Sequence, residues 1–201
     1  MTFIKTIPPG LAGADLQAFY RAQQGSLDYL PNYARLYGHR PGVMAAWAEL
    51  QRELKRHLDQ RAYSLISLAA ALATGSSCCA LAYGQRLLKA GFSSEDLIAV
   101  VLGEGTDPLT PAERCMVELA GKVAAAPASV RQEDIDALRA AGFSDPEIFD
   151  VVAAAAGRCF FARIPEALGA QPDAPLGEMD AALRDLLLVG RPLSRESGQG
   201  I

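Results

Sequence analysis

Two adjacent cysteines, in the run Ser76-Ser77-Cys78-Cys79, are the residues of this sequence best suited to chemistry. Gly75 separates two predicted helices, and Ser76 is placed as the N-cap of the second, so Cys79 occupies its third position. Unpaired N–H groups and the positive end of the helix dipole lower the pKa of a thiol there. We therefore expect Cys79 to be a nucleophilic thiolate, with a buried structural cysteine as the alternative.

Two hydroxyl groups lie within reach of Cys79 in this arrangement. Tyr83 follows one helical turn later on the same face. Its phenol is a poor base at neutral pH but can donate a hydrogen bond to a thiolate or a bound oxyanion; an ordinary buried tyrosine is the alternative. Ser76 can donate a hydrogen bond to Cys79 but cannot form a disulfide with it. Resolution of an oxidised Cys79 then requires an external thiol.

Cys78 is the other candidate thiol. It points about 100° away from Cys79 around the helix. A disulfide between neighbouring residues closes a strained ring, so Cys78 is a poor resolving partner. Which of the two cysteines is redox-active is open from the sequence. Cys115 and Cys159 lie in apolar helical surroundings and are expected in the core.

The elements that position these residues are predicted to be helices, because apolar residues recur at helical spacing and alternating β-branched runs are lacking. The segment Gln60–Ala73 is apolar on all sides and is expected to be buried. Local signals mark the ends of other segments: Gly91 and Gly142 as stops, and Ser93 and Ser144 as N-caps. The predicted helices span residues 15–24, 31–37, 43–58, 60–73, 76–90, from 93, 109–125, 130–141, 144–168 and 179–189.

The two halves of the chain repeat one plan. Leu87-Leu88-Lys89-Ala90-Gly91-Phe92-Ser93 aligns with Leu138-Arg139-Ala140-Ala141-Gly142-Phe143-Ser144, at an offset of 142 − 91 = 51 residues. This predicts an all-α fold with an internally duplicated helical unit. We expect one domain over residues 1–190 and a flexible C-terminal tail over residues 191–201.

The region from Pro41 to Pro172 resembles the carboxymuconolactone decarboxylase / AhpD-like family, including its peroxidase-related members. The resemblance rests on helix order, on the glycine stops and on the Cys segment, all in register. It implies an AhpD-like all-helical fold, catalysis without metal or other cofactor, and a homo-oligomer built from interlocking helices. Peroxidase members use a Cys-x-x-Cys pair with a glutamate and a histidine that relay the proton.

The resemblance assigns the catalytic positions one at a time. The first motif cysteine falls on Ser76 and the second on Cys79. The histidine falls on Tyr83, and the glutamate, twelve residues before the first cysteine, falls on Ser64 (76 − 12 = 64). The two-cysteine peroxidase cycle therefore cannot run with the same residues.

These substitutions leave two candidate functions and a third, purely structural, alternative. The first is a peroxidase-type oxidoreductase in which Cys79 reacts and an external thiol completes the cycle. The second is a non-redox member that binds a small molecule in a pocket bordered by Ser64, Ser76, Cys79 and Tyr83. The third is a purely structural protein with a collapsed site. For Arg163, after Phe160-Phe161, we expect burial against a carboxylate.

Composition sets outer limits on the partners. The chain of 201 residues has a net charge of −4, which argues against nucleic acids and anionic membranes. We expect a cytoplasmic protein, because the N-terminus lacks a signal-peptide pattern and no apolar run is long enough to span a membrane. Four cysteines and two histidines give no metal-site spacing. The surplus of apolar helical surface favours a homodimer, trimer or hexamer.

Overall fold

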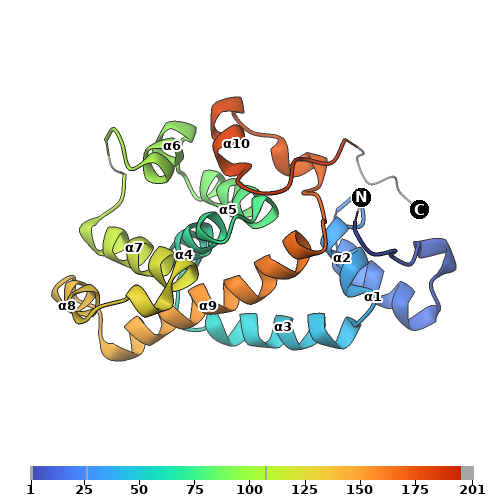
Figure 1. Cartoon of the computed structure of the whole chain (residues 1–201), viewed down its shortest axis with the longest axis horizontal. Helices are drawn as coiled ribbons and strands as arrows, with labels where there is room; N and C mark the ends of the chain where they lie inside the picture. Colours follow the sequence, from blue (N-terminus) through green and yellow to red (C-terminus); the bar gives the residue numbers. More distant parts are fainter. Residues whose placement is uncertain (1, 26, 107, 196–201) are drawn as a thin grey trace.

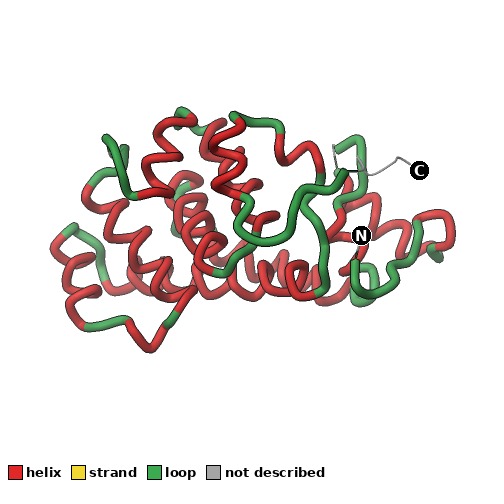
Figure 2. Tube along the Cα trace, turned by 45° about the horizontal axis from the view of Figure 1, so that its top comes forward, coloured by secondary structure: helices red, strands yellow, loops and turns green. Residues whose placement is uncertain are grey.

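The computed structural model describes residues 2–25, 27–106 and 108–195, and consists of α-helices joined by loops (Figures 1 and 2). No strand occurs within these ranges, so the predicted all-α class is confirmed. The helices are α1 (Ala14–Gln24), α2 (Asn32–Tyr37), α3 (Pro41–Leu54), α4 (Gln60–Ala73), α5 (Ser77–Lys89), α6 (Ser94–Leu102), α7 (Pro111–Ala125), α8 (Gln132–Ala140), α9 (Asp145–Ala167) and α10 (Ala181–Leu187).

Helix α4 forms the centre of the molecule, as its all-round apolar sequence predicts. Every residue from Tyr63 to Ala71 is buried. Helices α5, α7 and α9 pack against it (Figure 1). Each fully buried leucine or isoleucine contributes about 1.5–3 kcal/mol, so α4 is the main source of stability for the elements around it. Its first turn is capped by Asp59, whose carboxylate accepts from Ala62 N at 2.7 Å.

Helix starts follow the local signals in the sequence. Ser93 and Thr110 each begin a capping box, with Asp96 and Glu113 as the reciprocal partners. The main difference from prediction is α3, which ends at Leu54 rather than at residue 58. The residues that follow form the turn that places Asp59 outside the helix, where it can cap α4.

Helix α9 lies beside α3 at the base of the molecule (Figure 1). Gly157 makes this approach possible, because a Cβ there would lie 2.6 Å from Leu54 Cδ1 and 3.5 Å from the Trp47 ring. The next residue, Arg158, is thereby held against the aromatic ring of Trp47.

The segment after α10 runs back across the start of α5. Gly190 N donates to Ser77 Oγ at 2.7 Å, and Arg191 N donates to Glu166 Oε2 at 3.3 Å. Ser194 N donates to Pro172 O at 2.9 Å. Residues 191–195 of the predicted flexible tail therefore contact the body of the protein, and residues 196–201 lie outside the described residues. None of the described helices is both long and apolar enough to cross a membrane.

The proposed duplication is matched locally. Gly91 and Gly142 both have φ of 99° and end their helices in the same way. In each case the following phenylalanine N–H donates to the leucine carbonyl five residues back, at 3.1 Å to Leu87 and 3.0 Å to Leu138. Duplication of the whole unit stays a prediction.

Candidate functional site

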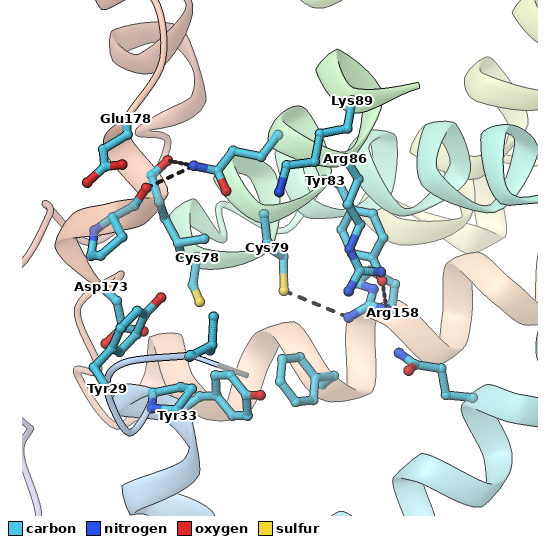
Figure 3. Close-up of a pocket in the computed structure, with 18 of the residues that line it drawn as sticks. Tyr29, Tyr33, Cys78, Cys79, Tyr83, Arg86, Lys89, Arg158, Asp173 and Glu178 are labelled. Carbon is cyan, nitrogen blue, oxygen red and sulfur yellow. Dashed lines mark hydrogen bonds between the residues drawn. The ribbon is translucent and has the colours of Figure 1, made fainter. Parts of the chain in front are cut away.

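A cavity of about 690 Å³ lies between α3, α5, α9 and the segment 173–178. Cys78 and Cys79 both line it, as does Tyr83 (Figure 3). One wall is aromatic, formed by Tyr33, Trp47 and Phe161, whose rings contact one another in pairs. The cavity therefore combines a pair of sulfur atoms with an aromatic wall.

The start of α5 positions the two cysteines as predicted, but Ser76 does not act as predicted. Ser76 is the N-cap residue, which places Cys79 at the third helical position. The Ser76 side chain makes no capping hydrogen bond, is fully buried and lies outside the cavity lining. It cannot serve Cys79 as a donor inside the cavity.

An acidic residue lies at this helix start instead. Burial raises the pKa of Glu166, while the backbone N–H groups of Arg191 and Ser77 and the hydroxyl of Ser76 act in the opposite direction. A carboxylate placed here interacts favourably with the helix dipole. The dipole therefore acts on Glu166 as well as on the thiols.

Arg158 is the group that faces Cys79. It is only 3% exposed, and its Nη1 donates to Cys79 Sγ at 4.0 Å. Its Nη2 donates to Tyr63 Oη at 3.0 Å. The same nitrogen donates to Tyr83 Oη (Figure 3). No carboxylate forms an ion pair with Arg158 in the described part of the chain, and its Nε has no hydrogen-bond partner there.

A buried cation without a carboxylate partner favours an anion beside it. Burial works against the Arg158 charge, but Tyr83, Cys79 and Tyr63 outweigh it and raise the pKa of the guanidinium above its usual value. The guanidinium also lies 4.6 Å from the centre of the Tyr83 ring. Arg158 thus stays charged, and its guanidinium contacts the sulfur of Cys79.

Cys78 has the opposite surroundings. Burial raises the pKa of its thiol well above the usual value, and Cys79, Asp173 and Glu166 raise it further. Arg158 counteracts only part of this. Cys78 is therefore a neutral thiol at physiological pH, and Cys79 is the better candidate nucleophile.

Tyr83 fits the predicted role of hydrogen-bond donor rather than base. Burial raises the pKa of its hydroxyl to about 12, so the phenol is neutral at pH 7. Its oxygen accepts from Arg158, and the hydroxyl of Ser67 also acts on it.

Ser64 is not brought to the cavity. It is 2% exposed on α4, and its hydroxyl donates to Gln60 O at 2.7 Å within the same helix. Among the described residues, the pocket expected from sequence thus contains Cys79 and Tyr83 but neither Ser64 nor Ser76.

Two charged residues of the site were missed from the sequence. Arg163 was expected to be buried against a carboxylate, but it is exposed, and its Nη2 donates to Ala124 O at 3.5 Å. The buried arginine is Arg158, five positions earlier and about 140° away around α9. The sequence feature that could have pointed to Arg158 is its position as a single charged residue within the apolar run Ala153–Phe161.

Asp173 is the second missed residue. It is 2% exposed, and its carboxylate accepts from Asn32 N at 3.0 and 3.3 Å. Burial raises its pKa to about 6. No local pattern marks it, because its partner is 141 residues away. No group of three or more His, Cys, Asp or Glu in the described part of the chain is arranged to hold a metal ion.

The comparisons with known proteins agree with this geometry. Residues 41–122, which carry α3, α4, α5, α6 and most of α7, match the model of the carboxymuconolactone decarboxylase family. Over this segment the chain is similar to that family. The matched segment supplies both cysteines and Tyr83, whereas Arg158 and Asp173 come from the chain that follows it.

Solved structures extend the match over nearly the whole chain. An AhpD-core, peroxidase-related protein from Ralstonia eutropha JMP134 has a TM-score of 0.74 at 22% identity, covering 94% of this chain and 98% of its own. A peroxidase-related protein from Silicibacter sp. TM1040 has a TM-score of 0.72 at 20% identity, covering 89% and 95%. At these identities the match shows the AhpD-like fold.

A third relative has a ligand in its structure. The debrominase Bmp8, solved in complex with 2,3,4-tribromopyrrole, has a TM-score of 0.65 at 21% identity, covering 87% of this chain and 90% of its own. Among curated proteins no significant match exists. The fold is thus shared by proteins named for peroxide and for halogen chemistry.

Proposed function

We propose that this protein is a thiol-dependent oxidoreductase in which the Cys79 thiolate is the nucleophile and an external thiol is the reductant. One observation carries the proposal: a buried guanidinium, from Arg158, that lacks a carboxylate partner in the described structure lies against Cys79 Sγ inside a cavity. Such a cation stabilises a thiolate, which is the reactive form of cysteine.

With an organic hydroperoxide, the reaction balances as follows. Cys79 sulfur attacks the outer peroxide oxygen, an S–O bond forms and the O–O bond breaks. The alkoxide takes up a proton and leaves as an alcohol, so the peroxide is reduced and Cys79 is oxidised to a sulfenic acid. The Tyr83 hydroxyl, neutral at pH 7, can donate a hydrogen bond to the departing oxygen.

The external thiol then restores Cys79. Its sulfur attacks the sulfenic acid, an S–S bond forms and water leaves; a second thiol releases Cys79 and an external disulfide. Cys115 and Cys159 do not line the cavity, and Cys78 is the strained neighbour, so none of them replaces the external thiol. The cytoplasm, which maintains reduced thiols, is the compartment we propose.

The cavity supports an organic substrate rather than hydrogen peroxide alone. Its volume of about 690 Å³ and its aromatic wall offer far more surface than hydrogen peroxide can contact. A halogenated aromatic ring would use the same wall, and the debrominase among the structural relatives makes this a substrate class to test.

The test compares wild type with Cys79→Ser and Cys78→Ser, using cumene hydroperoxide or 2,3,4-tribromopyrrole with dithiothreitol. We expect Cys79→Ser to lose about 100-fold or more in kcat/KM and Cys78→Ser to stay within about threefold, because only Cys79 contacts the guanidinium. Trapping with dimedone should label Cys79 after peroxide treatment.

Full activity in Cys79→Ser would disprove the proposal. A wild type that turns over neither compound and gives no dimedone adduct would favour the alternative, a non-redox protein that binds a small molecule in the same cavity.

We also propose self-association through the outer face of α3 and α9. Val43, Leu50 and Phe160 are 40%, 48% and 45% exposed there, and they border a shallow groove with Ala46 and Trp47. Exposed apolar clusters of this kind mark interaction surfaces. Light scattering should give a dimer, trimer or hexamer that Leu50→Glu weakens; a mass of one 21.3 kDa chain for wild type would contradict this.

A further inference from the structure

One end of the cavity gathers cations without matching anions. Arg86 and Lys89 extend from α5 along the cavity wall, near Arg158 (Figure 3). Lys55, after α3, lies 4.8 Å above the Tyr63 ring. None of these four cations forms an ion pair with a carboxylate within the described ranges.

The side chains between the cations hold three of them in place. The Tyr83 ring contacts both guanidinium groups, Arg86 at 4.9 Å and Arg158 at 4.6 Å. The Tyr63 ring contacts Lys55, and its hydroxyl accepts from Arg158. The two tyrosine rings also pack edge to face, with centres 6.1 Å apart. Lys89, one turn after Arg86 on α5, is exposed and adds its charge beside this group.

The cations repel one another. The pKa of Lys55 is lowered by its burial and then by Arg86 and Arg158. Uncompensated positive charge at a partly enclosed site attracts an anionic ligand. Arg158 Nε, buried and without a hydrogen-bond partner, adds a donor at this end that the described chain leaves unused.

The other end of the cavity carries the opposite charge. Asp173 and Glu178 line it, on the side of Cys78 (Figure 3). A ligand with one anionic group is repelled there and attracted to Arg86 and Lys89, which fixes its orientation. The rest of the ligand then lies along the aromatic wall beside Cys79.

We propose that this cationic end, formed by Arg86 and Lys89 with Arg158 behind them, binds the carboxylate of the organic molecule that reacts at Cys79. The inference rests on the proposed function in that Cys79 is the reactive thiol. Either the oxidising substrate or the thiol reductant can carry the carboxylate, because both reach Cys79 through the same cavity.

The first test measures binding without turnover. Iodoacetamide alkylates Cys79, identified by fragment mass spectrometry, and the rate is followed with added phenylacetate or its neutral match, phenylacetamide. We expect phenylacetate to protect Cys79 at about tenfold lower concentration, which corresponds to about 1.4 kcal/mol from two partly exposed ion pairs. Equal protection by the two compounds would overturn the inference.

Charge variants locate the effect. In Arg86→Gln/Lys89→Gln the preference for phenylacetate should fall to about twofold or less, in keeping with the loss of two ion pairs. Arg131→Gln/Arg139→Gln removes the same net charge from α8, which lines no part of this cavity, and should keep the preference. A preference that survives the first variant, or falls equally in both, would contradict a subsite at Arg86 and Lys89.

Turnover assays distinguish the two sources of the carboxylate. A carboxylated hydroperoxide and its methyl ester form one pair, and thioglycolate and methyl thioglycolate form the other. For each compound, kcat/KM of wild type is divided by kcat/KM of Arg86→Gln/Lys89→Gln, so that the intrinsic reactivity of the compound cancels. If the variant loses about fivefold in kcat/KM for the acid of one pair but not for its ester, that acid is the molecule whose carboxylate binds the subsite. No loss for either acid would overturn the inference, whereas protection by phenylacetate without any turnover would support the subsite and refute only the redox proposal.

Discussion

The two ends of the cavity place neighbouring cysteines in opposite electrostatic surroundings. At one end Cys79 contacts a buried guanidinium; at the other, Cys78 lies near two carboxyl groups, Asp173 and Glu166, that raise the pKa of its thiol. The two residues share a helix turn, a cavity and almost complete burial. What separates them is which part of the later chain each one meets: α9 supplies Arg158, and the segment after α9 supplies Asp173. The surroundings that distinguish the two cysteines therefore come from distant residues rather than from helix position.

Removing the cation should have the largest effect on this difference. In Arg158→Met, the rate at which iodoacetamide alkylates Cys79 at pH 7 should fall by about 100-fold, because the buried cation that contacts the Cys79 sulfur and favours its anionic form is removed.

Arg163→Met is the matched control, since it removes an exposed arginine from the same helix. It should leave the alkylation rate of Cys79 at pH 7 unchanged. The unfolding free energy of Arg158→Met should not fall much, because a buried charge without a carboxylate contributes little net stability. An unchanged Cys79 alkylation rate in Arg158→Met would remove the basis of the comparison.

The acidic end should appear in the pH dependence of stability. The Asp173 pKa is about 6 in the folded protein against a reference of 3.8, so the folded state binds the proton more tightly. The contribution of Asp173 to the free energy of unfolding is therefore greatest below about pH 4, and it is lost as pH rises through about 6. Asp173→Asn, which keeps an acceptor for Asn32 N, should gain about 2 kcal/mol at pH 8 and nothing at pH 4.

Urea unfolding at the two pH values measures this, with Glu178→Gln as control. Glu178 lines the same end but is exposed, so its replacement should change stability little at either pH. An Asp173→Asn variant that is no more stable than wild type at pH 8 would show that the carboxylate is adequately stabilised where it lies.

Tyr83 should give the smallest effect. Tyr83→Phe removes a hydroxyl that accepts from Arg158 but leaves the ring that contacts both guanidinium groups. We expect Cys79 alkylation to change by about threefold or less, as for loss of a single hydrogen bond beside a charge that retains other partners. A loss as large as that of Arg158→Met would mean that the hydroxyl, rather than the cation, controls the thiol.

Local chemistry made most of the fold predictable. Ser93, Thr110 and Gly91 act within their own turns, so the helix boundaries they imply are found in the structure within one or two residues. The all-apolar sequence of Gln60–Ala73 could only be a core helix, and its bounds were predicted without error. Where a boundary depended on the next element, as at the end of α3, the predicted helix was longer than the helix in the structure.

The site was only half predictable, because its charges come from remote residues. Cys79 and Tyr83 were paired correctly by helical spacing, which is a local property. Ser64 satisfies its hydroxyl within its own helix, and Ser76 is enclosed beneath the C-terminal segment, and neither outcome is visible in residue order. Arg158 and Asp173 join the site across 79 and 141 positions through contacts that no local pattern encodes.

The contact between Gly190 and Ser77 makes the order of synthesis matter. The hydrogen bond joins residues 113 positions apart, and Gly190 has no room for a side chain, since a Cβ would lie 2.0 Å from Gly75 O. During translation α4, α5 and α7 can assemble early, but the first turn of α5 stays uncovered and Asp173 is absent until the later segment docks. A nascent chain therefore carries both thiols before Arg158 and Asp173 are in place, and the surroundings of the two thiols differ only after α9 and the segment that follows it have packed.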